Sequence, residues 1–194
     1  MKLPNSAHTD RPWRVHEIAP DFRVYDVWAL PTPGGPDDFP RLVQQFAGGD
    51  TGDNSSGIAR LLFAIRWKLG ALLGWDDPKA GVGSRVPKLR DRLPADLREG
   101  PVGPEYDKLP FTPVFLTDDE LVAEMANKTV HGVLQLGWVQ DEDGGYRGQM
   151  AVLVKPNGLF GKAYMAAIGP FRHLFVYPPL MRDIGREWKA NAPR

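Results

Sequence analysis

The stretch that decides the fold is residues 129–155, which read TVHGVLQLGWVQDEDGGYRGQMAVLVK. Residues 129–140 are rich in strand formers, and residues 146–155 form a second run of the same kind. Between them lies Asp141-Glu142-Asp143-Gly144-Gly145, a strong signal for a turn between two strands. The stretch therefore predicts an antiparallel hairpin.

The segment before this hairpin, residues 119–126, fits either a helix or a strand. Thr117-Asp118-Asp119-Glu120 resembles a capping box, which favours a helix. Asn127-Lys128 is a plausible tight turn into the strand formers that follow, which favours another hairpin. We choose the hairpin, so the three segments together predict an antiparallel meander.

One face of this meander is apolar and aromatic, because side chains alternate between the two faces of a strand. A long helical pattern follows Pro156-Asn157-Gly158, and its apolar stripe predicts a helix across that face. Pro170 and Pro178-Pro179 predict that this helix kinks or breaks. One parity of the strands holds Val130, Leu134, Leu136 and Trp138, then Tyr146, Met150, Val152 and Val154, whereas His131, Val133, Gln135 and Val139 share the other.

The first half of the chain predicts shorter elements and one long connection. A Pro- and Gly-rich excursion at about residues 76–113 is a surface loop, a lid or an insertion packed over the core. Because 194 residues fit one domain of ordinary size, we expect a single domain over residues 1–194. The predicted elements are a strand at 13–18, an extended run at 22–30, helices at 37–47 and 56–75, and a short helix within 88–98.

Composition narrows the classes of protein. Lys plus Arg equals Asp plus Glu at 24 each, which disfavours a dedicated nucleic-acid binder. There is no cysteine, so disulfides, thiolate metal sites and cysteine nucleophiles are excluded. The start of the chain lacks the apolar stretch of a signal peptide, and charged residues interrupt the apolar run at 56–75. We therefore expect a cytoplasmic protein without a transmembrane segment.

Several segments resemble a known family. These are residues 152–164 and 170–175, then Met181-Arg182-Asp183-Ile184, together with residues 12–17 and 27–31 near the start. The chain is similar there to an uncharacterised bacterial family, a domain of unknown function that also occurs behind short-chain-dehydrogenase-like domains. The family pattern has Pro-Phe-His, whereas here Arg172 separates Phe171 from His173. A role tied to that histidine is therefore not carried over.

The family resembles the START-like (SRPBCC, helix-grip) superfamily. That resemblance implies an α+β fold in which a curved antiparallel sheet grips a long C-terminal helix. It also implies an apolar cavity between sheet and helix that holds a lipophilic or aromatic ligand, with the 76–113 excursion as its lid. Six residues either line such a cavity or simply fill the core: Trp138, Tyr146, Met150, Tyr164, Phe171 and Phe175.

No catalytic motif stands out. The four histidines lack metal-site spacing, no serine sits in a nucleophile elbow, and Gly158-Leu159-Phe160-Gly161-Lys162 lacks the phosphate-loop pattern. We therefore expect no metal and no cofactor. His131 and Tyr164 are the candidates for proton transfer, although a structural histidine in the sheet is the commoner meaning.

Three hypotheses follow for the function. The first is binding of a small lipophilic or aromatic ligand without chemistry. The second is a cyclase- or hydrolase-type enzyme that uses the same cavity. The third is an interaction module that docks a protein partner such as a reductase, or a second copy of the chain.

Overall fold

The computed structural model describes residues 1–48, 82–83, 86–106, 111–127 and 130–192. The helix predicted at 56–75 lies outside the described residues. So do the side chains of Tyr164, Phe171 and Phe175, although the backbone of each belongs to a described helix.

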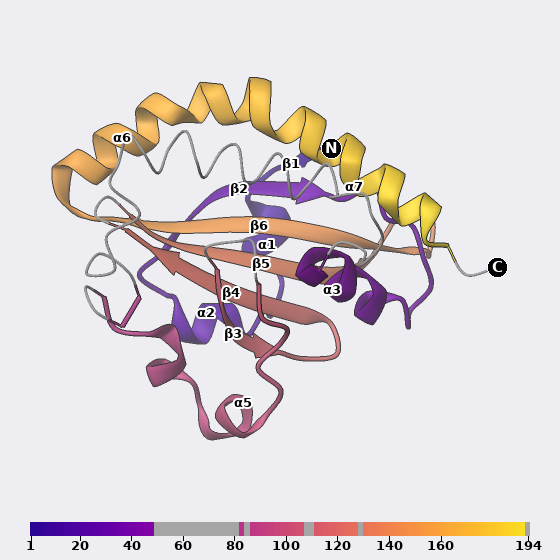
Figure 1. The fold of residues 1–194 in the computed structure, drawn as a ribbon, viewed down its shortest axis with the longest axis horizontal. Coiled ribbons are helices and arrows are strands. Elements are labelled where there is room, and N and C mark those ends of the chain that lie inside the picture. Colours follow the sequence, from indigo (N-terminus) through magenta and orange to yellow (C-terminus); the bar gives the residue numbers. More distant parts are fainter. Residues whose placement is uncertain (49–81, 84–85, 107–110, 128–129, 193–194) are drawn as a thin grey trace.

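The described residues form an α+β fold around a curved, open, six-stranded antiparallel sheet (Figure 1). The strand order is β1-β2-β6-β5-β4-β3, so β1 and β3 form the edges. The predicted meander is confirmed as β4-β5-β6, and the helical alternative for residues 119–126 is wrong. The strands are β1 (Lys2–Leu3), β2 (Arg23–Ala29), β3 (Thr112–Leu116), β4 (Glu120–Ala126), β5 (Val130–Gln140) and β6 (Tyr146–Pro156).

The turn between β5 and β6 fixes the register of the central hairpin. Gly144 has φ of 83°, a backbone conformation that only glycine adopts without strain. The Asp141 amide donates to the Gly145 carbonyl at 2.8 Å, and Gln140 pairs with Tyr146 at the start of the ladder. Because the side-chain period of a strand is two residues, this register decides which side chains enter each layer.

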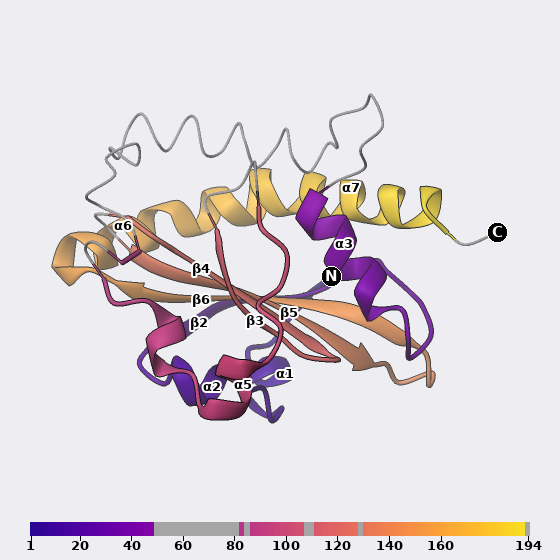
Figure 2. The ribbon, with the colours of Figure 1, turned by 60° about the horizontal axis from the view of Figure 1, so that its bottom comes forward.

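Helices cover both faces of the sheet (Figure 2). The N-terminal helices and the described part of the 76–113 excursion gather on one face, and the C-terminal helix crosses the other together with α3. We call the first the N-terminal face and the second the helix face. The helices are α1 (Ser6–Thr9), α2 (Val15–Ile18), α3 (Phe39–Gly48), the 3-10 turn η2 (Leu89–Arg92), α5 (Ala95–Glu99), α6 (Gly158–Phe171), the π-helical η3 (Arg172–Val176) and α7 (Tyr177–Ala190).

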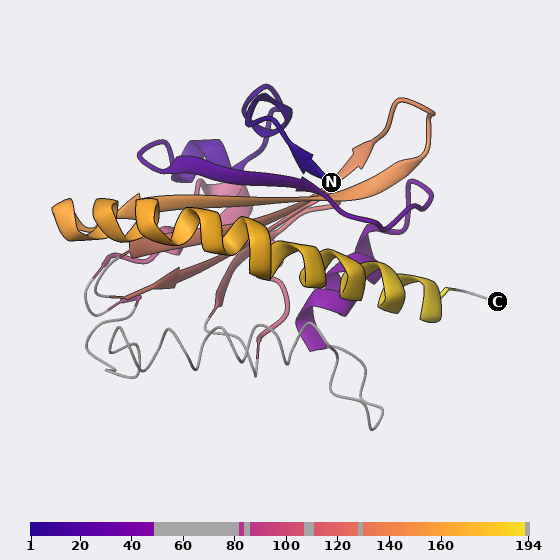
Figure 3. The ribbon, with the colours of Figure 1, turned by 90° about the horizontal axis from the view of Figure 1, so that it is seen from above.

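The long C-terminal helix runs across the helix face, as the apolar stripe predicts (Figure 3). Its predicted irregularity is confirmed, because π-helical turns separate α6 from α7. Pro178 and Pro179 lie in the first turn of α7, where a missing N–H costs no hydrogen bond. Leu180 and Ile184 of α7 are buried in the apolar cluster of the helix face.

One prediction for the first half is wrong, and one of the three alternatives for the excursion is supported. Residues 13–18 hold helix α2 rather than a strand, because the side chain of Glu120 accepts hydrogen bonds from the amides of Arg14 and Val15 at the start of α2. The described part of the excursion also does not cover the helix face. Leu89, Leu93 and Leu97 are buried in the core of the N-terminal face, so this segment is an insertion packed over the core.

Candidate functional site

The aromatic residues predicted on β5 and β6 do gather on the helix face. Trp138 and Met150 are buried in one apolar cluster, against which the half-buried Tyr146 packs. The Trp138 indole N–H donates to the Gly35 carbonyl at 2.9 Å, and its ring lies 5.9 Å from that of Trp188. These rings pack on one another. The cavity expected between sheet and helix stays a prediction, since its other proposed lining residues, Tyr164, Phe171 and Phe175, have side chains outside the described part.

His131 lies on the other face, as its parity predicts. Its Nε2 is 2.7 Å from Oε2 of Glu124, and both side chains are buried. The second carboxylate oxygen of Glu124 accepts a hydrogen bond from the Leu89 amide at 2.9 Å, and Phe22 packs edge-on against the imidazole. This pair therefore ties η2 to the sheet, and proton transfer by His131 stays a prediction.

A cleft opens at the end of the N-terminal face, where the first residues of the chain cross the turn before β4. Its volume is about 410 Å³, within the range of small-molecule sites. The N-terminal segment forms one wall, the β3–β4 turn forms another, and β5 contributes Trp138, whose indole packs on the helix face. The lining residues of this Glu120 cleft are Arg11, Pro12, Trp13, Arg14, Thr117, Asp119, Glu120 and Trp138.

Glu120 is the buried acid of the cleft, with only 1% of its surface exposed. Its carboxylate accepts hydrogen bonds from the amides of Arg14 at 2.8 Å and Val15 at 3.3 Å, and from Nε2 of Gln135 at 3.4 Å. Burial nevertheless raises the pKa of Glu120 to about 7. Near neutral pH this carboxyl is therefore present in both protonation states, as a group that donates or accepts a proton must be.

Trp13 closes the cleft against the sheet. Its ring passes directly over Gly137, where a Cβ atom would lie 2.5 Å from the ring edge, so only glycine leaves room for it. Trp13 Nε1 and Gln135 Oε1 are both buried, and neither has a hydrogen-bond partner among the described residues. A buried donor and a buried acceptor without partners are costly, and such groups mark places where a bound molecule can supply the missing bonds.

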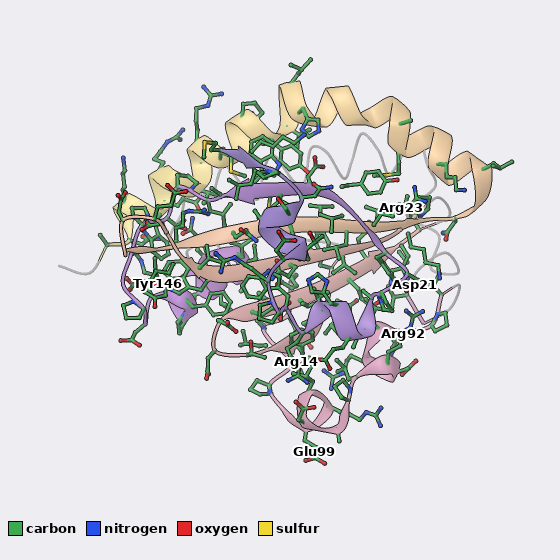
Figure 4. All side chains as sticks on the ribbon, turned by 180° about the vertical axis from the view of Figure 1, so that it is seen from behind. Arg14, Asp21, Arg23, Arg92, Glu99 and Tyr146 are labelled. Atoms are coloured by element: carbon green, nitrogen blue, oxygen red, sulfur yellow. The ribbon has the colours of Figure 1, made fainter. Side chains whose placement is uncertain are left out.

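The two arginines of the cleft differ in what they bind. Arg14 forms ion pairs with Glu17 at 2.5 Å and with Asp96 of α5 at 2.8 Å (Figure 4). The Arg11 guanidinium has no ion pair within the part of the chain that the structure describes. Burial lowers the pKa of Arg147, and the positive charge of Arg11 lowers it further although Asp141 opposes this. Arg11 therefore brings a positive charge to the wall of the cleft.

Two histidines lie under the same N-terminal segment. The rings of His8 and His16 meet edge to face at 4.9 Å, and His8 is fully buried. Burial, and then the charge of His16, lowers the pKa of His8 to about 4, so His8 is neutral at physiological pH. The neighbouring Gln149 donates from Nε2 to the Ala7 carbonyl at 3.1 Å, which fixes α1 on the sheet.

A second polar cluster lies beneath the C-terminal helix. The Asp26 carboxylate accepts a hydrogen bond from the Tyr177 hydroxyl at 2.9 Å and lies 3.1 Å from Nε2 of His173. Lys2 Nζ is 3.2 Å from the same imidazole nitrogen. The β-bulge between Val24 and Asp26 turns the carboxylate towards the helix and so pairs it with this histidine.

Sequence reasoning missed Glu120. A single carboxylate at the start of a strand carries no motif, and the capping-box pattern at residues 117–120 even suggested the wrong helix. Glu120 does bind the first turn of a helix, but that helix is α2, more than 100 residues earlier in the chain. The described residues contain no cluster of three metal-ligating side chains, and none of the described helices is long and apolar enough to cross a membrane.

The comparisons with known proteins give a family and no activity. A family described as Protein of unknown function (DUF2867) matches residues 18–179, which include β2 to β6 and Glu120. The matched range leaves out Arg11 and Trp13 of the cleft wall. No curated protein and no solved structure matches the chain. Because the match covers most of its length, the chain belongs to the DUF2867 family.

Proposed function

We propose that this domain binds a small lipophilic or aromatic molecule in the Glu120 cleft. The observation that carries the proposal is the convergence of the Trp13 indole, an arginine without an ion pair among the described residues, and a buried carboxyl group on a concavity of about 410 Å³. Aromatic walls bury an apolar ligand, and a few polar groups orient it. This places the ligand on the N-terminal face, whereas the sequence favoured the helix face.

Kinship with the START-like, helix-grip superfamily is part of the same proposal. What supports it is the curved antiparallel sheet with a long C-terminal helix across one face. An association with a short-chain-dehydrogenase-like partner, a cytoplasmic location and the single-domain organisation are likewise expectations from the sequence. The binding proposal rests on the cleft itself, since one fold serves many functions.

Two measurements test the binding proposal. Native mass spectrometry of gently purified protein should show a discrete mass excess from a bound molecule. Titration with 2-naphthol, followed by saturation-transfer NMR, should show binding that the Gly137→Ala variant weakens, because the added methyl group pushes the Trp13 ring into the cleft. Gly169→Ala is the matched control, since a Cβ at Gly169 meets nothing within 4 Å. Equal binding by both variants, or none by the wild type, contradicts the proposal.

One observation favours an enzyme as the second candidate. A carboxyl group whose pKa lies at about 7 suits general acid–base catalysis at neutral pH, and Glu120 has that property. In such an enzyme Glu120, rather than His131 or Tyr164, exchanges the proton with the substrate. Once a substrate is known, Glu120→Gln should abolish turnover and leave substrate binding intact. Turnover that survives the substitution contradicts this role.

A further inference from the structure

One arginine of the Glu120 cleft and the indole N–H of Trp13 are hydrogen-bond donors without partners among the described residues. The Arg11 guanidinium carries a full positive charge without an ion pair among the described residues, and the buried Trp13 N–H is likewise unpartnered there. Arg14 also lines the cleft, but Glu17 and Asp96 already occupy its guanidinium. Since the Trp13 N–H is buried, the donor that the open cleft offers to a ligand is the Arg11 cation, which suits an anionic oxygen.

The protonation state of the buried Glu120 decides how well such an anion is accepted in the cleft. An ionised Glu120 would repel a second negative charge at close range, whereas a protonated Glu120 would not. The other charged groups around Glu120 are Arg11 and Arg14 from the N-terminal segment and Asp119 from its own turn. His8 of α1 stays neutral through this range, because burial lowers its pKa to about 4.

Gln135 can form a hydrogen bond with Glu120 whether Glu120 is ionised or protonated. Its Nε2 donates to the carboxylate at 3.4 Å, and its Oε1 has no partner among the described residues. Turning the amide by 180° would present Oε1 to a protonated Glu120, which then donates instead of accepting. The floor of the cleft therefore has a partner for Glu120 whether the proton is present or absent.

We infer that the ligand of this cleft is a small aromatic carboxylate, held through its anionic group by Arg11, and that it binds when Glu120 is protonated. The aromatic ring lies against the indole of Trp13, and the carboxylate faces Arg11. This inference rests on the proposed binding function and adds the charge of the ligand and the proton that accompanies it. No covalent step is involved.

The pH dependence follows from the fraction of protein that is competent to bind. The pKa of Glu120 is about 7, so about nine-tenths of the molecules are protonated at pH 6 and about one-tenth at pH 8. Because apparent affinity scales with the competent fraction, the affinity for the carboxylate should fall about tenfold between these pH values. Glu120→Gln imitates the neutral acid, so it should bind at both pH values with about the affinity of the wild type at pH 6.

The experiment compares 2-naphthoate with its neutral analogue 2-naphthamide by isothermal titration calorimetry at pH 6 and pH 8. The wild type should prefer the carboxylate at pH 6 by about tenfold or more, which is one charge-assisted contact of about 1.4 kcal/mol. Arg11→Ala should remove this preference. Arg23→Ala is the matched control, because Arg23 is an exposed arginine at the start of β2, outside the lining of the cleft (Figure 4).

The outcomes separate this inference from the function on which it rests. If 2-naphthamide binds as tightly as 2-naphthoate, the cleft binds aromatic molecules but the inferred anion is wrong. If the carboxylate is preferred equally at both pH values, or the pH dependence survives in Glu120→Gln, the role of Glu120 is wrong. If neither probe binds and native mass spectrometry shows no bound molecule, the proposed function fails as well.

Discussion

The hydroxyl of Tyr177 donates a hydrogen bond to the carboxylate of Asp26 at 2.9 Å, across 151 residues of sequence. Both side chains are buried, and Trp28 stacks on the Tyr177 ring at 4.7 Å. The contact joins β2 to the first turn of α7. It therefore fixes the C-terminal helix on the sheet at the point where the π-helical turns end.

Replacing Tyr177 with Phe should destabilise the protein. The substitution leaves the ring in place and removes a hydrogen bond to a buried carboxylate, which costs about 1.5–3 kcal/mol. Urea unfolding measures this change in the free energy of unfolding. Tyr146→Phe is the matched control, because the Tyr146 hydroxyl has no hydrogen bond within the described residues, and it should change stability by less than about 0.5 kcal/mol. Equal effects of the two variants would contradict the proposed anchor.

Two titratable groups should make the stability of the protein depend on pH, and their effects on stability are opposite. Burial raises the pKa of Glu120 from 4.5 to about 7, so the folded state binds the proton more tightly and stability falls as pH rises through that range. Burial lowers the pKa of His8 from 6.5 to about 4, so stability rises with pH between those values. Each effect amounts to about 3 kcal/mol.

Between pH 4.5 and 6.5 the change of stability with pH caused by Glu120 and the change caused by His8 should therefore cancel each other. Glu120→Gln removes one of them, so its stability relative to the wild type should increase by about 1.4 kcal/mol for each pH unit across this window. Chemical denaturation at half-unit steps of pH measures the difference. A constant difference between variant and wild type would show that Glu120 titrates normally in the folded protein.

The Glu124–His131 pair should be structural. His131→Leu leaves a buried carboxylate without its partner, which costs about 3–5 kcal/mol. Adding Glu124→Gln removes the unpaired charge, so the double variant should be more stable than His131→Leu alone. Thermal unfolding of both single variants and the double variant completes the cycle. Additive effects would mean that the two side chains do not interact.

Asp21 connects the insertion to the sheet. Its carboxylate lies 2.8 Å from Arg92 of η2 and 2.6 Å from Lys155 of β6, and Figure 4 shows Asp21 and Arg92 close together. Burial alone would raise the pKa of Asp21, but hydrogen bonds from Arg92 and Lys155 bring it down to about 2. The pair is more than one-third exposed, so Asp21→Asn should cost no more than about 1 kcal/mol.

The contribution of Asp21 has a definite pH range. Because the folded pKa is depressed, the stabilisation is present above pH 3.8 and is lost as pH falls towards 2. Acid denaturation should therefore begin at higher pH in Asp21→Asn than in Asp91→Asn, which removes an exposed carboxylate of η2. Identical acid transitions of the two variants would show that the ion pairs do not stabilise the fold.

The sequence predicted the central architecture because the signals there are local. Period-two alternation in residues 130–140 and 146–156 assigned each side chain to a face, and the glycine-containing turn between them set the register. The apolar stripe of residues 158–190 then placed a helix on the apolar face. These patterns involve neighbours in sequence, so no distant contact is needed to read them.

Helix α2 is an element that local patterns in the sequence do not predict. Residues 15–18 alternate like a strand, yet they form a helix whose first amides donate to Glu120, about 105 residues away in sequence. The Glu120 cleft depends on the same long-range contact. A buried carboxyl and an unpartnered indole acquire their properties from the loss of water around them, and burial is decided only when the N-terminal segment packs on the sheet.

The sequence by itself therefore determined the meander, its two faces and the helix that crosses one of them. The spacing of apolar residues along a strand or a helix can be seen in a short stretch of sequence. Only the tertiary structure decided which carboxylate is buried, which arginine has no ion pair among the described residues, and on which face the described part of the insertion packs. Those properties come from contacts between segments far apart in the chain, and a single sequence does not specify such contacts through any local period or spacing.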